Sequence, residues 1–510
     1  MSVTTDTLRI KAGADWDFTQ LQSAHDEIEA VALGEMGLDI YRTQIEVITA
    51  EQMLDAYSSI GLPLMYRHWS FGKRFARDES LYRHGLRSLA YEIVINSDPC
   101  IVYIMEENTM AMQTLVLAHA AFGHNHFFKN NNLFRQWTDA GGILAYMEFA
   151  KSYIARCEEK YGEAAVERLL DAAHALMSQG VSRYPRRNFS LEDEEKRAAE
   201  RRAEQQRTFN DLWRTLPGQR GPARRPTDAA ERRRLLGLPE ENLLYFLEKK
   251  APLLKPWQRE VLRIVRHIGQ YFYPQKQTKM MNEGCATYVH YKVMNRLHER
   301  GVLDDGAMLE FLHSHTSVVF QPDFDDRRYG GLNPYALGFA MMQDIERIAE
   351  RPSEEDRIWF PEIAGSGDAI GHLREAWANY RDESFIRQFL SPALIRKLRL
   401  FSVFDDGQSD LTVRAIHNER GYRQIRGALA DSFDVVRQEP EIEIVDVDLD
   451  GDRRLLLQHR VHSGMLLDQG DAELVLQHLA TLWGYDVRLA EVDAVSERVL
   501  RTHDAGAPSR

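Results

Sequence analysis

An apolar stretch at residues 115–128, with the sequence LVLAHAAFGHNHFF, constrains the chain more than any other part of it. The stretch predicts an apolar helix, yet it carries His119, His124 and His126. Together with a second stretch at residues 281–290, it gathers more potential metal ligands in apolar surroundings than any other part of the sequence. We therefore take these two stretches as the functional centre.

The spacing of the histidines decides which of them could share one ion. His119 and His124 are five residues apart, which is roughly 140° around a regular α-helix. They could bind the same ion only if the helix stopped between them, and Gly123 is a residue type that often follows a helix end. The helix is expected to begin after a cap at Asn108 or Thr109. It should end at Gly123, so that His124 turns back toward His119.

The second stretch, residues 281–290, adds Glu283 and His290. These two lie on one face of a helix but about 10 Å apart along it, too far apart to bind the same ion. Imidazole and carboxylate are usual ligands of zinc. We predict a divalent ion, with zinc as the expected metal, bound by His119, His124 and Glu283, with one position open for water as in catalytic sites. His290 would then support the ligands, act as an acid or base, or bind a second ion.

A general base must come from outside the motif that zincin metalloproteases use. In His-Glu-x-x-His a glutamate follows the first histidine, whereas Ala120 follows His119 here. Glu107, just before the expected helix, is the predicted base, with Glu106 behind it. The segment Asn282-Glu-Gly-Cys-Ala resembles the one that supplies the third ligand in glutamate zincins. A zincin-like helical core is therefore one expectation.

The same histidines also have a purely structural interpretation. A single histidine on an apolar helix is most often a hydrogen-bonded core residue. Three histidines within eight residues, with a glutamate in a second apolar stretch, bring a metal site to near-even odds with that alternative. His68, His313 and His315 are interpreted as structural or pocket-lining residues.

The chain is expected to be mainly helical, of the α+β class, and to have four parts. These are a helical half of the core at 1–185, a charged and flexible insertion at 186–242, a second helical half at 243–400 and a small α/β domain at 401–510.

Apolar periodicity predicts the elements inside these parts. Helices are expected at 18–37 and 41–57, and a β-hairpin that turns at Ser97-Asp-Pro is expected at 91–105, before the histidine helix. In the last part, strands are expected at 411–416 and 442–449, and helices at 421–429 and 473–483.

Charge and cysteine content argue against some functions. The net charge of −13 argues against nucleic acid as the main partner. The three cysteines are far apart and odd in number, so neither a disulfide framework nor a cysteine zinc site is expected. No secretory signal is recognisable at Met1, and no apolar run approaches the ~20 residues that span a bilayer. A cytoplasmic location is the expectation.

Eight segments also carry a resemblance to a known family. They are Tyr66-Arg-His-Trp-Ser-Phe-Gly-Lys, Tyr91-Glu-Ile-Val-Ile-Asn, Met105-Glu-Glu-Asn, Ala118-His-Ala-Ala-Phe-Gly-His, Phe127-Phe-Lys-Asn-Asn, Tyr271-Phe-Tyr-Pro-Gln, Met281-Asn-Glu-Gly and Asn333-Pro-Tyr-Ala-Leu-Gly-Phe. In this order, they closely resemble the stage V sporulation protein R (SpoVR) family, over nearly the whole chain.

The resemblance implies cellular links and no firmly attached reaction. Sporulation members are linked to formation of the spore cortex, a peptidoglycan layer. Relatives in bacteria that do not sporulate are linked to a PrkA-type serine protein kinase and a von Willebrand-like partner, in stationary-phase and stress responses. The resemblance thus implies partners as well as a possible substrate class.

The family's pattern also matches individual residues. Its two histidines fall on His119 and His124, its Asn-Glu-Gly glutamate on Glu283, and the histidine after that on His290. His126 falls at a variable position and is set aside as a ligand. The family often has tryptophan at positions 285 and 289, where this chain has cysteine and valine, which puts a pocket wall in doubt but not the ligands.

Two hypotheses follow. The first is a cytoplasmic metal-dependent hydrolase of amide bonds in a peptide or a peptidoglycan-related molecule, with Glu107 as general base and His290 stabilising or protonating the leaving group. The second is a non-catalytic regulatory or assembly protein that acts with the kinase and its partner. In that case the polar cluster would be a structural network or a metal staple.

Overall fold

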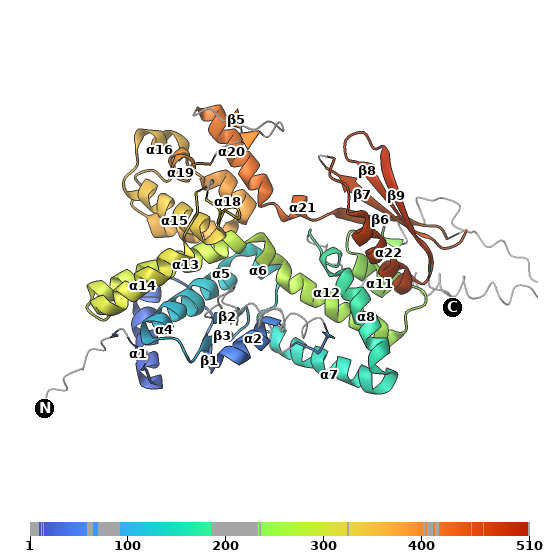
Figure 1. The fold of residues 1–510 in the computed structure, drawn as a ribbon, viewed down its shortest axis with the longest axis horizontal. Helices are drawn as coiled ribbons and strands as arrows, with labels where there is room; N and C mark the ends of the chain where they lie inside the picture. The colour runs from blue at the N-terminus through green and yellow to red at the C-terminus, as the bar shows by residue number, and fades with distance from the viewer. Residues whose placement is uncertain are drawn as a thin grey trace, which may run out of the picture. The chain divides into compact units, whose positions relative to one another are not determined.

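The computed structural model describes residues 10–58 except 12 and 14, 65–69, 92–184, 233, 236–323, 326–400, 403–404, 412–413, 418–449, 451–462 and 464–507. The chain divides by its contacts into two compact units, whose elements are labelled in Figure 1. The core unit comprises Met1–Leu170 and Gln270–Glu439, and the sheet unit comprises Asp171–Gly269 and Pro440–Arg510. The protein is of the α+β class, as expected, and most of its elements are helices.

The two units follow tertiary contacts, so their borders differ from the four parts expected from composition. The border near the C-terminus lies at Pro440 and not at 401, because α20 (Glu419–Ser432) packs against α18 (Asp382–Phe389) in the core unit. The segment 171–269 belongs with the C-terminal sheet, since Glu240 forms a β-bridge with Ile444. Most of the charged insertion expected at 186–242 lies outside the described residues.

Helices form most of the core unit. They are α1 (Phe18–Glu29), η1 (Ala30–Glu35), α2 (Ala50–Ser58), α4 (Met110–Val116), η2 (Leu117–His124), α5 (Asn125–Asn130), α6 (Asn132–Trp137), α7 (Ile143–Tyr161), α13 (Lys279–Glu299), α14 (Asp305–Val318), α15 (Pro334–Glu350), α16 (Glu354–Trp359), α17 (Ala369–Asn379), α18, α19 (Pro392–Lys397), α20 and α21 (Val435–Gln438). Two further helices, α8 (Glu163–Ala175) and α12 (Pro256–Gln277), include the borders between the units.

A three-stranded sheet lies next to these helices. The expected hairpin before the histidine helix is confirmed: β2 (Glu92–Ile95) pairs antiparallel with β3 (Cys100–Met105). The third strand, β1 (Thr43–Ile48), pairs parallel with β3 and gives the order β1-β3-β2. The helix expected over 41–57 is therefore wrong for its first half. The residues of β1 alternate in type like a strand, and the ladder with β3 decides their conformation.

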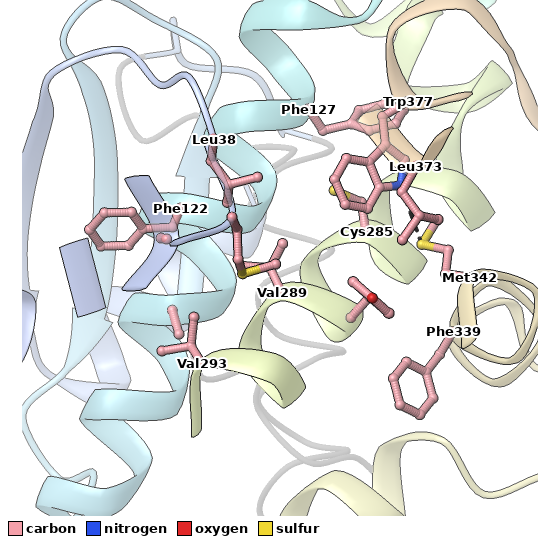
Figure 2. Close-up of a cluster of buried hydrophobic side chains, with 14 of the residues drawn as sticks. Leu38, Phe122, Phe127, Cys285, Val289, Val293, Phe339, Met342, Leu373 and Trp377 are labelled. Carbon is pink, nitrogen blue, oxygen red and sulfur yellow. Dashed lines mark hydrogen bonds between the residues drawn. The ribbon is translucent and has the colours of Figure 1, made fainter. Parts of the chain in front are cut away.

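The helix α13 lies at the centre of the core unit, between η2 on one side and α15 on the other. Figure 2 shows its residues Cys285, Val289 and Val293 between Phe122 of η2 and the α15 side chains. Close approach on both sides depends on small residues. A Cβ at Gly123 would lie 2.5 Å from Ala286 Cα, and one at Gly284 would lie 2.7 Å from the Gly338 carbonyl carbon.

The helix that carries the histidines begins as expected but does not end at Gly123. The Thr109 side chain caps α4 by accepting a hydrogen bond from the Met112 N–H. The helix then continues through η2, which is a π-helix, and into α5 without a break. Gly123 provides the close contact with Ala286, so its lack of a side chain serves helix packing and not helix termination.

The sheet unit contains four strands in the order β6 (Glu441–Val447), β7 (Leu455–Val461), β8 (Val487–Asp493) and β9 (Val499–Ala505). The strands β7 and β8 are parallel, and α22 (Gln469–Trp483) connects them. On its inner face, the buried Glu491 accepts hydrogen bonds from His503 Nε2 (2.8 Å), the Arg501 side chain (2.6 Å) and the Leu467 N–H (2.9 Å). The last segment of the chain, from Pro440, thus contains both strands and a helix, and it forms one unit with Asp171–Gly269.

Two of the elements expected in the small α/β domain belong elsewhere. The helix expected at 421–429 lies within α20 of the core unit. Of the strand expected at 411–416, the structure describes only β5 (Thr412–Val413), paired with β4 (Val403–Phe404). Among the described residues, no helix combines the length and the apolar character needed to cross a membrane.

Candidate metal site

Three elements of the core unit bring together a cluster of two imidazoles and two carboxylates. His119 and His124 come from η2, Glu283 from α13, and Glu92 from β2. The histidine side chains are 7% and 9% exposed, whereas both glutamate side chains are 18% exposed. The two glutamate side chains are therefore somewhat more exposed than the two histidines.

The π-helical turn places both histidines on one face. In a π-helix the hydrogen bonds join residues five apart, so residues at that spacing lie above one another. The rings of His119 and His124 accordingly meet edge to face, with centroids 4.6 Å apart. The sequence required that His119 and His124 lie on one face if they are to share an ion. The wider turn of the π-helix achieves this without a break in the helix.

The donor atoms have the spacing that a small cation requires. His119 Nε2 lies 3.5 Å from Glu92 Oε1 and 3.8 Å from Glu283 Oε2, and His124 Nε2 lies 3.6 Å from Glu283 Oε2. One ligand atom each from Glu92, His119 and His124 lie within 4.8 Å of one another. In a tetrahedral site with bonds of about 2.0–2.2 Å, two donor atoms are about 3.3–3.6 Å apart. These residues therefore fit a divalent ion such as zinc.

Each histidine of the cluster is held through its other ring nitrogen by a residue of α13. His124 Nδ1 lies 3.0 Å from Asn282 Oδ1, and His119 Nδ1 lies 2.9 Å from His290 Nδ1. In a neutral imidazole one nitrogen donates and the other accepts. A partner at Nδ1 therefore leaves each Nε2 directed at the carboxylates.

His290 lies behind the cluster. Its Nδ1 contacts His119, and its Nε2 lies 2.9 Å from Nδ1 of His315 on α14. With both nitrogens in contact with other imidazoles, His290 does not face Glu92 or Glu283. From the sequence, His290 could have been an acid or base, a ligand of a second ion, or a residue that supports the ligands. Its contacts with His119 and His315 fit the supporting role. Burial also lowers the pKa of His290 well below its usual value and that of His315 to about 4.

The two carboxyl groups have pKa values shifted in opposite directions. Burial raises the pKa of Glu92, and the charge of Glu283 raises it further, although His119 opposes the shift. For Glu283, burial also acts to raise the pKa, but the neighbouring His119 and His124 and the Tyr335 hydroxyl outweigh it, and the pKa is lowered. Opposite shifts of two neighbouring carboxyl groups are a pattern that acid–base catalysis uses.

The pKa values of His119 and His124 are also shifted in opposite directions. Burial alone would lower the pKa of His119, but Glu92 and Glu283 raise it above the usual value. Burial and the neighbouring His119 lower the pKa of His124 to about 4. His124 is therefore a neutral imidazole at pH 7, which is the form that binds metal ions.

Glu107, the base expected from the sequence, lies elsewhere. Its exposed carboxylate accepts a hydrogen bond of 3.2 Å from the Ala50 N–H at the start of α2. Glu107 precedes the Thr109 cap of α4, and His119 lies nine residues beyond Met110, the first residue of that helix, which is about 14 Å along the helix. Among the described residues, Glu92 is the further carboxylate that reaches the cluster.

Sequence reasoning missed Glu92, Asn282 and Tyr335 as site residues. The signal for Glu92 was a charged residue in an otherwise apolar β-branched strand, Glu92-Ile-Val-Ile. His126 lies outside the cluster, where its Nδ1 is 2.9 Å from the Asp39 carbonyl oxygen. His313 is exposed, and His315 is structural in the sense that it contacts His290.

Comparison with known proteins identifies the family to which the chain belongs. The family model described as "SpoVR like protein" matches residues 15–438, and the model described as "SpoVR-like C-terminal domain" matches residues 440–494. The "Uncharacterized protein YcgB" of Escherichia coli (strain K12) is 54% identical over 492 residues, which cover 96% of this chain and 95% of that protein. No solved structure matches the chain. The chain belongs to the SpoVR family.

Proposed function

We propose that this protein is a metal-dependent hydrolase in which His119, His124 and Glu283 bind a divalent ion, with zinc as the expected metal. The observation that carries the proposal is the spacing of the donor atoms, since Glu283 Oε2 lies 3.6 Å from His124 Nε2 and 3.8 Å from His119 Nε2. These distances are longer than ordinary hydrogen bonds but close to the distance between two ligands of one ion.

Glu92 takes the role of general base that the sequence assigned to Glu107. An ion held in the cluster would polarise a substrate carbonyl and lower the pKa of a nearby water molecule. Because burial raises the pKa of Glu92, this carboxylate is suited to accept a proton and to pass it to a leaving amine. The pKa of Glu283 is lowered, with contributions from the neighbouring His119 and His124 and from the Tyr335 hydroxyl, which favours the ionised form that binds metal ions.

The proposed substrate class is an amide bond, in a peptide or a peptidoglycan-related molecule. Its support is the likeness of Asn282-Glu-Gly-Cys-Ala to the third-ligand segment of glutamate zincins and the link of sporulation relatives to the cortex. This chain departs from the zincins in its histidine spacing, since His119 and His124 are five apart on a π-helix. We therefore propose that the protein shares the chemistry of the zincins but not their histidine spacing.

Metal analysis of the purified full chain tests the proposal. Wild type should bind about one ion per chain, and the double variant His119→Ala with Glu283→Ala should bind none. Glu92→Gln should keep the ion and lose hydrolysis of peptidoglycan fragments or amide peptides, whereas Glu107→Gln, the matched control, should keep both. A wild-type protein that binds no zinc, manganese or iron in stoichiometric amount would overturn the proposal.

A regulatory or assembly role in the cytoplasm, with a PrkA-type serine kinase and a von Willebrand-like protein, is the second candidate. The observation that favours it is the separate sheet unit, whose described residues contribute nothing to the cluster and could therefore serve another role. If the His119→Ala, Glu283→Ala variant restores wild-type stress survival to cells that lack the protein, this role replaces the hydrolase.

A further inference from the structure

Three histidines of the core unit form an unbroken chain of ring contacts. His119 Nδ1 lies 2.9 Å from His290 Nδ1, and His290 Nε2 lies 2.9 Å from His315 Nδ1. The three residues come from three elements, η2, α13 and α14, and all three are buried. A contact of this length between two ring nitrogens requires that one carries hydrogen and the other does not. Hydrogen-bond donation along the three rings therefore has a direction.

We infer that His290 and His315 are positioning residues that fix the orientation and the tautomer of the metal ligand His119. In this arrangement His119 donates from Nδ1 to His290 Nδ1, and His290 donates from Nε2 to His315 Nδ1. His119 Nε2 is then left with its lone pair directed at Glu92 and Glu283. The inference rests on the proposed metal site, and it names the residues that prepare that site.

The opposite direction would disable the ligand. If His290 donated from Nδ1, a neutral His119 would carry its hydrogen on Nε2 and could not bind a cation there. If His290 donates from Nε2, His315 Nδ1 must accept, so a neutral His315 carries its hydrogen on Nε2. In this arrangement a residue that does not touch the ion supports the tautomer in which Nε2 of His119 is free.

The packing of both supporting rings is suited to this task. The His290 ring meets Phe311 edge to face at 5.9 Å, and the His315 ring meets Phe339 edge to face at 4.9 Å. The Tyr291 ring lies 5.2 Å from the His315 ring. Aromatic contacts at these distances restrict the rotation of both imidazoles, so the contacts of the chain are held in place.

The second ligand shows the same arrangement with a different partner. His124 Nδ1 contacts the Asn282 side chain at 3.0 Å, and Asn282 and His290 lie eight residues apart on α13. One helix therefore orients both histidines of η2 through their Nδ1 atoms and also supplies Glu283. Loss of such supporting contacts typically reduces metal affinity about 10- to 100-fold.

The test measures zinc affinity of metal-free full-length protein by competition with a chelator. His290→Asn places an amide oxygen close to the position of Nδ1 and can still accept from His119, whereas His290→Leu cannot. We expect His290→Leu to bind zinc about 10- to 100-fold more weakly and His290→Asn to stay within a few-fold of wild type. His459→Leu, which removes an equally buried histidine of the sheet unit, should keep wild-type affinity.

Each outcome decides the inference. Wild-type affinity in His290→Leu overturns the inference and leaves the metal site intact, as does an equal loss in His290→Asn and His290→Leu, which would reflect the shape of the site. Absence of zinc binding in wild type overturns the proposed function as well. If His290→Leu does not fold, His315→Phe replaces it. For His315→Phe we expect several-fold weaker zinc binding and a shift in the visible spectrum of the cobalt-substituted protein. If both values are unchanged, the inference is overturned.

Discussion

At the scale of single residues, carboxyl groups in apolar surroundings determine the pH behaviour of the core unit. Asp382 is buried and accepts hydrogen bonds of 2.8 Å from the N–H groups of Met280 and Met281, at the start of α13. It therefore caps the helix that carries Glu283, from a position about a hundred residues away in sequence. Burial raises the pKa of Asp382 to about 7, although the two N–H groups act against the shift.

Replacing this carboxyl group should change how stability depends on pH. Because the folded protein binds the Asp382 proton more tightly than the unfolded chain does, wild-type stability should fall as pH rises from about 4 to about 7. Asparagine cannot take up or release this proton. As the pH rises through the same range, the free energy of unfolding of Asp382→Asn should therefore increase relative to that of wild type. Urea unfolding at a series of pH values measures the difference. Asp304→Asn, at the partly exposed cap of α14, is the control, and an equal slope there would contradict the assignment.

Tyr335 should tune metal binding through Glu283. Its hydroxyl donates to the Glu283 carboxylate and helps to lower the pKa of that group. In Tyr335→Phe the pKa of Glu283 should rise, so that protons compete better with the ion and zinc is released at a higher pH than in wild type. Zinc release followed during acid titration measures this shift. Tyr245→Phe in the sheet unit should leave the release curve unchanged.

At the scale of elements, the site depends on how closely η2 and α15 approach α13. Gly123 faces Ala286 on one side, and Gly284 faces Gly338 on the other. The sequence indicated the importance of these stretches, but it assigned Gly123 to a helix end. A glycine needed for close contact and a glycine that follows a helix look the same in one sequence, since only the neighbouring helix distinguishes them.

Adding one methyl group between these helices should destabilise the core unit. In Gly284→Ala the new Cβ would lie 2.7 Å from the backbone of Gly338, so the helices must separate, at a cost of about 1–3 kcal/mol. Zinc affinity should fall as well, because Glu283 moves with α13. Gly427→Ala is the matched control, since nothing lies within 4 Å of its Cβ, and it should be neutral or stabilising by up to about 1 kcal/mol. Chemical denaturation of both variants gives the comparison.

At the scale of the whole molecule, the residues of the proposed metal site belong to one compact unit. Glu92, His119, His124 and Glu283 all lie within the segments of the core unit, and the buried Glu491 network lies within the sheet unit. These two sets of residues lie in different units, so we expect the stability of each unit to respond to changes in its own set. Sequence composition indicated several domains but not that each unit combines two segments of the chain.

Calorimetry should therefore show two unfolding transitions with different responses. Zinc at about 100 times its dissociation constant should stabilise the core unit by about 2.7 kcal/mol and shift only that transition. Glu491→Gln should lower only the transition of the sheet unit, because it weakens contacts to His503 and Arg501. A single transition that responds to both changes would show that the units unfold together.

The sequence by itself determined the residue types of the site and their local frame. It identified His119, His124 and Glu283, the hairpin before them and the helices that carry them, because apolar periodicity and unusual polar residues are local signals. The tertiary structure alone decided that the histidines share a face through a π-helical turn, that Glu92 and not Glu107 joins them, and that His290 lies behind His119. These features depend on contacts between segments far apart in the chain, and no local pattern encodes such distances.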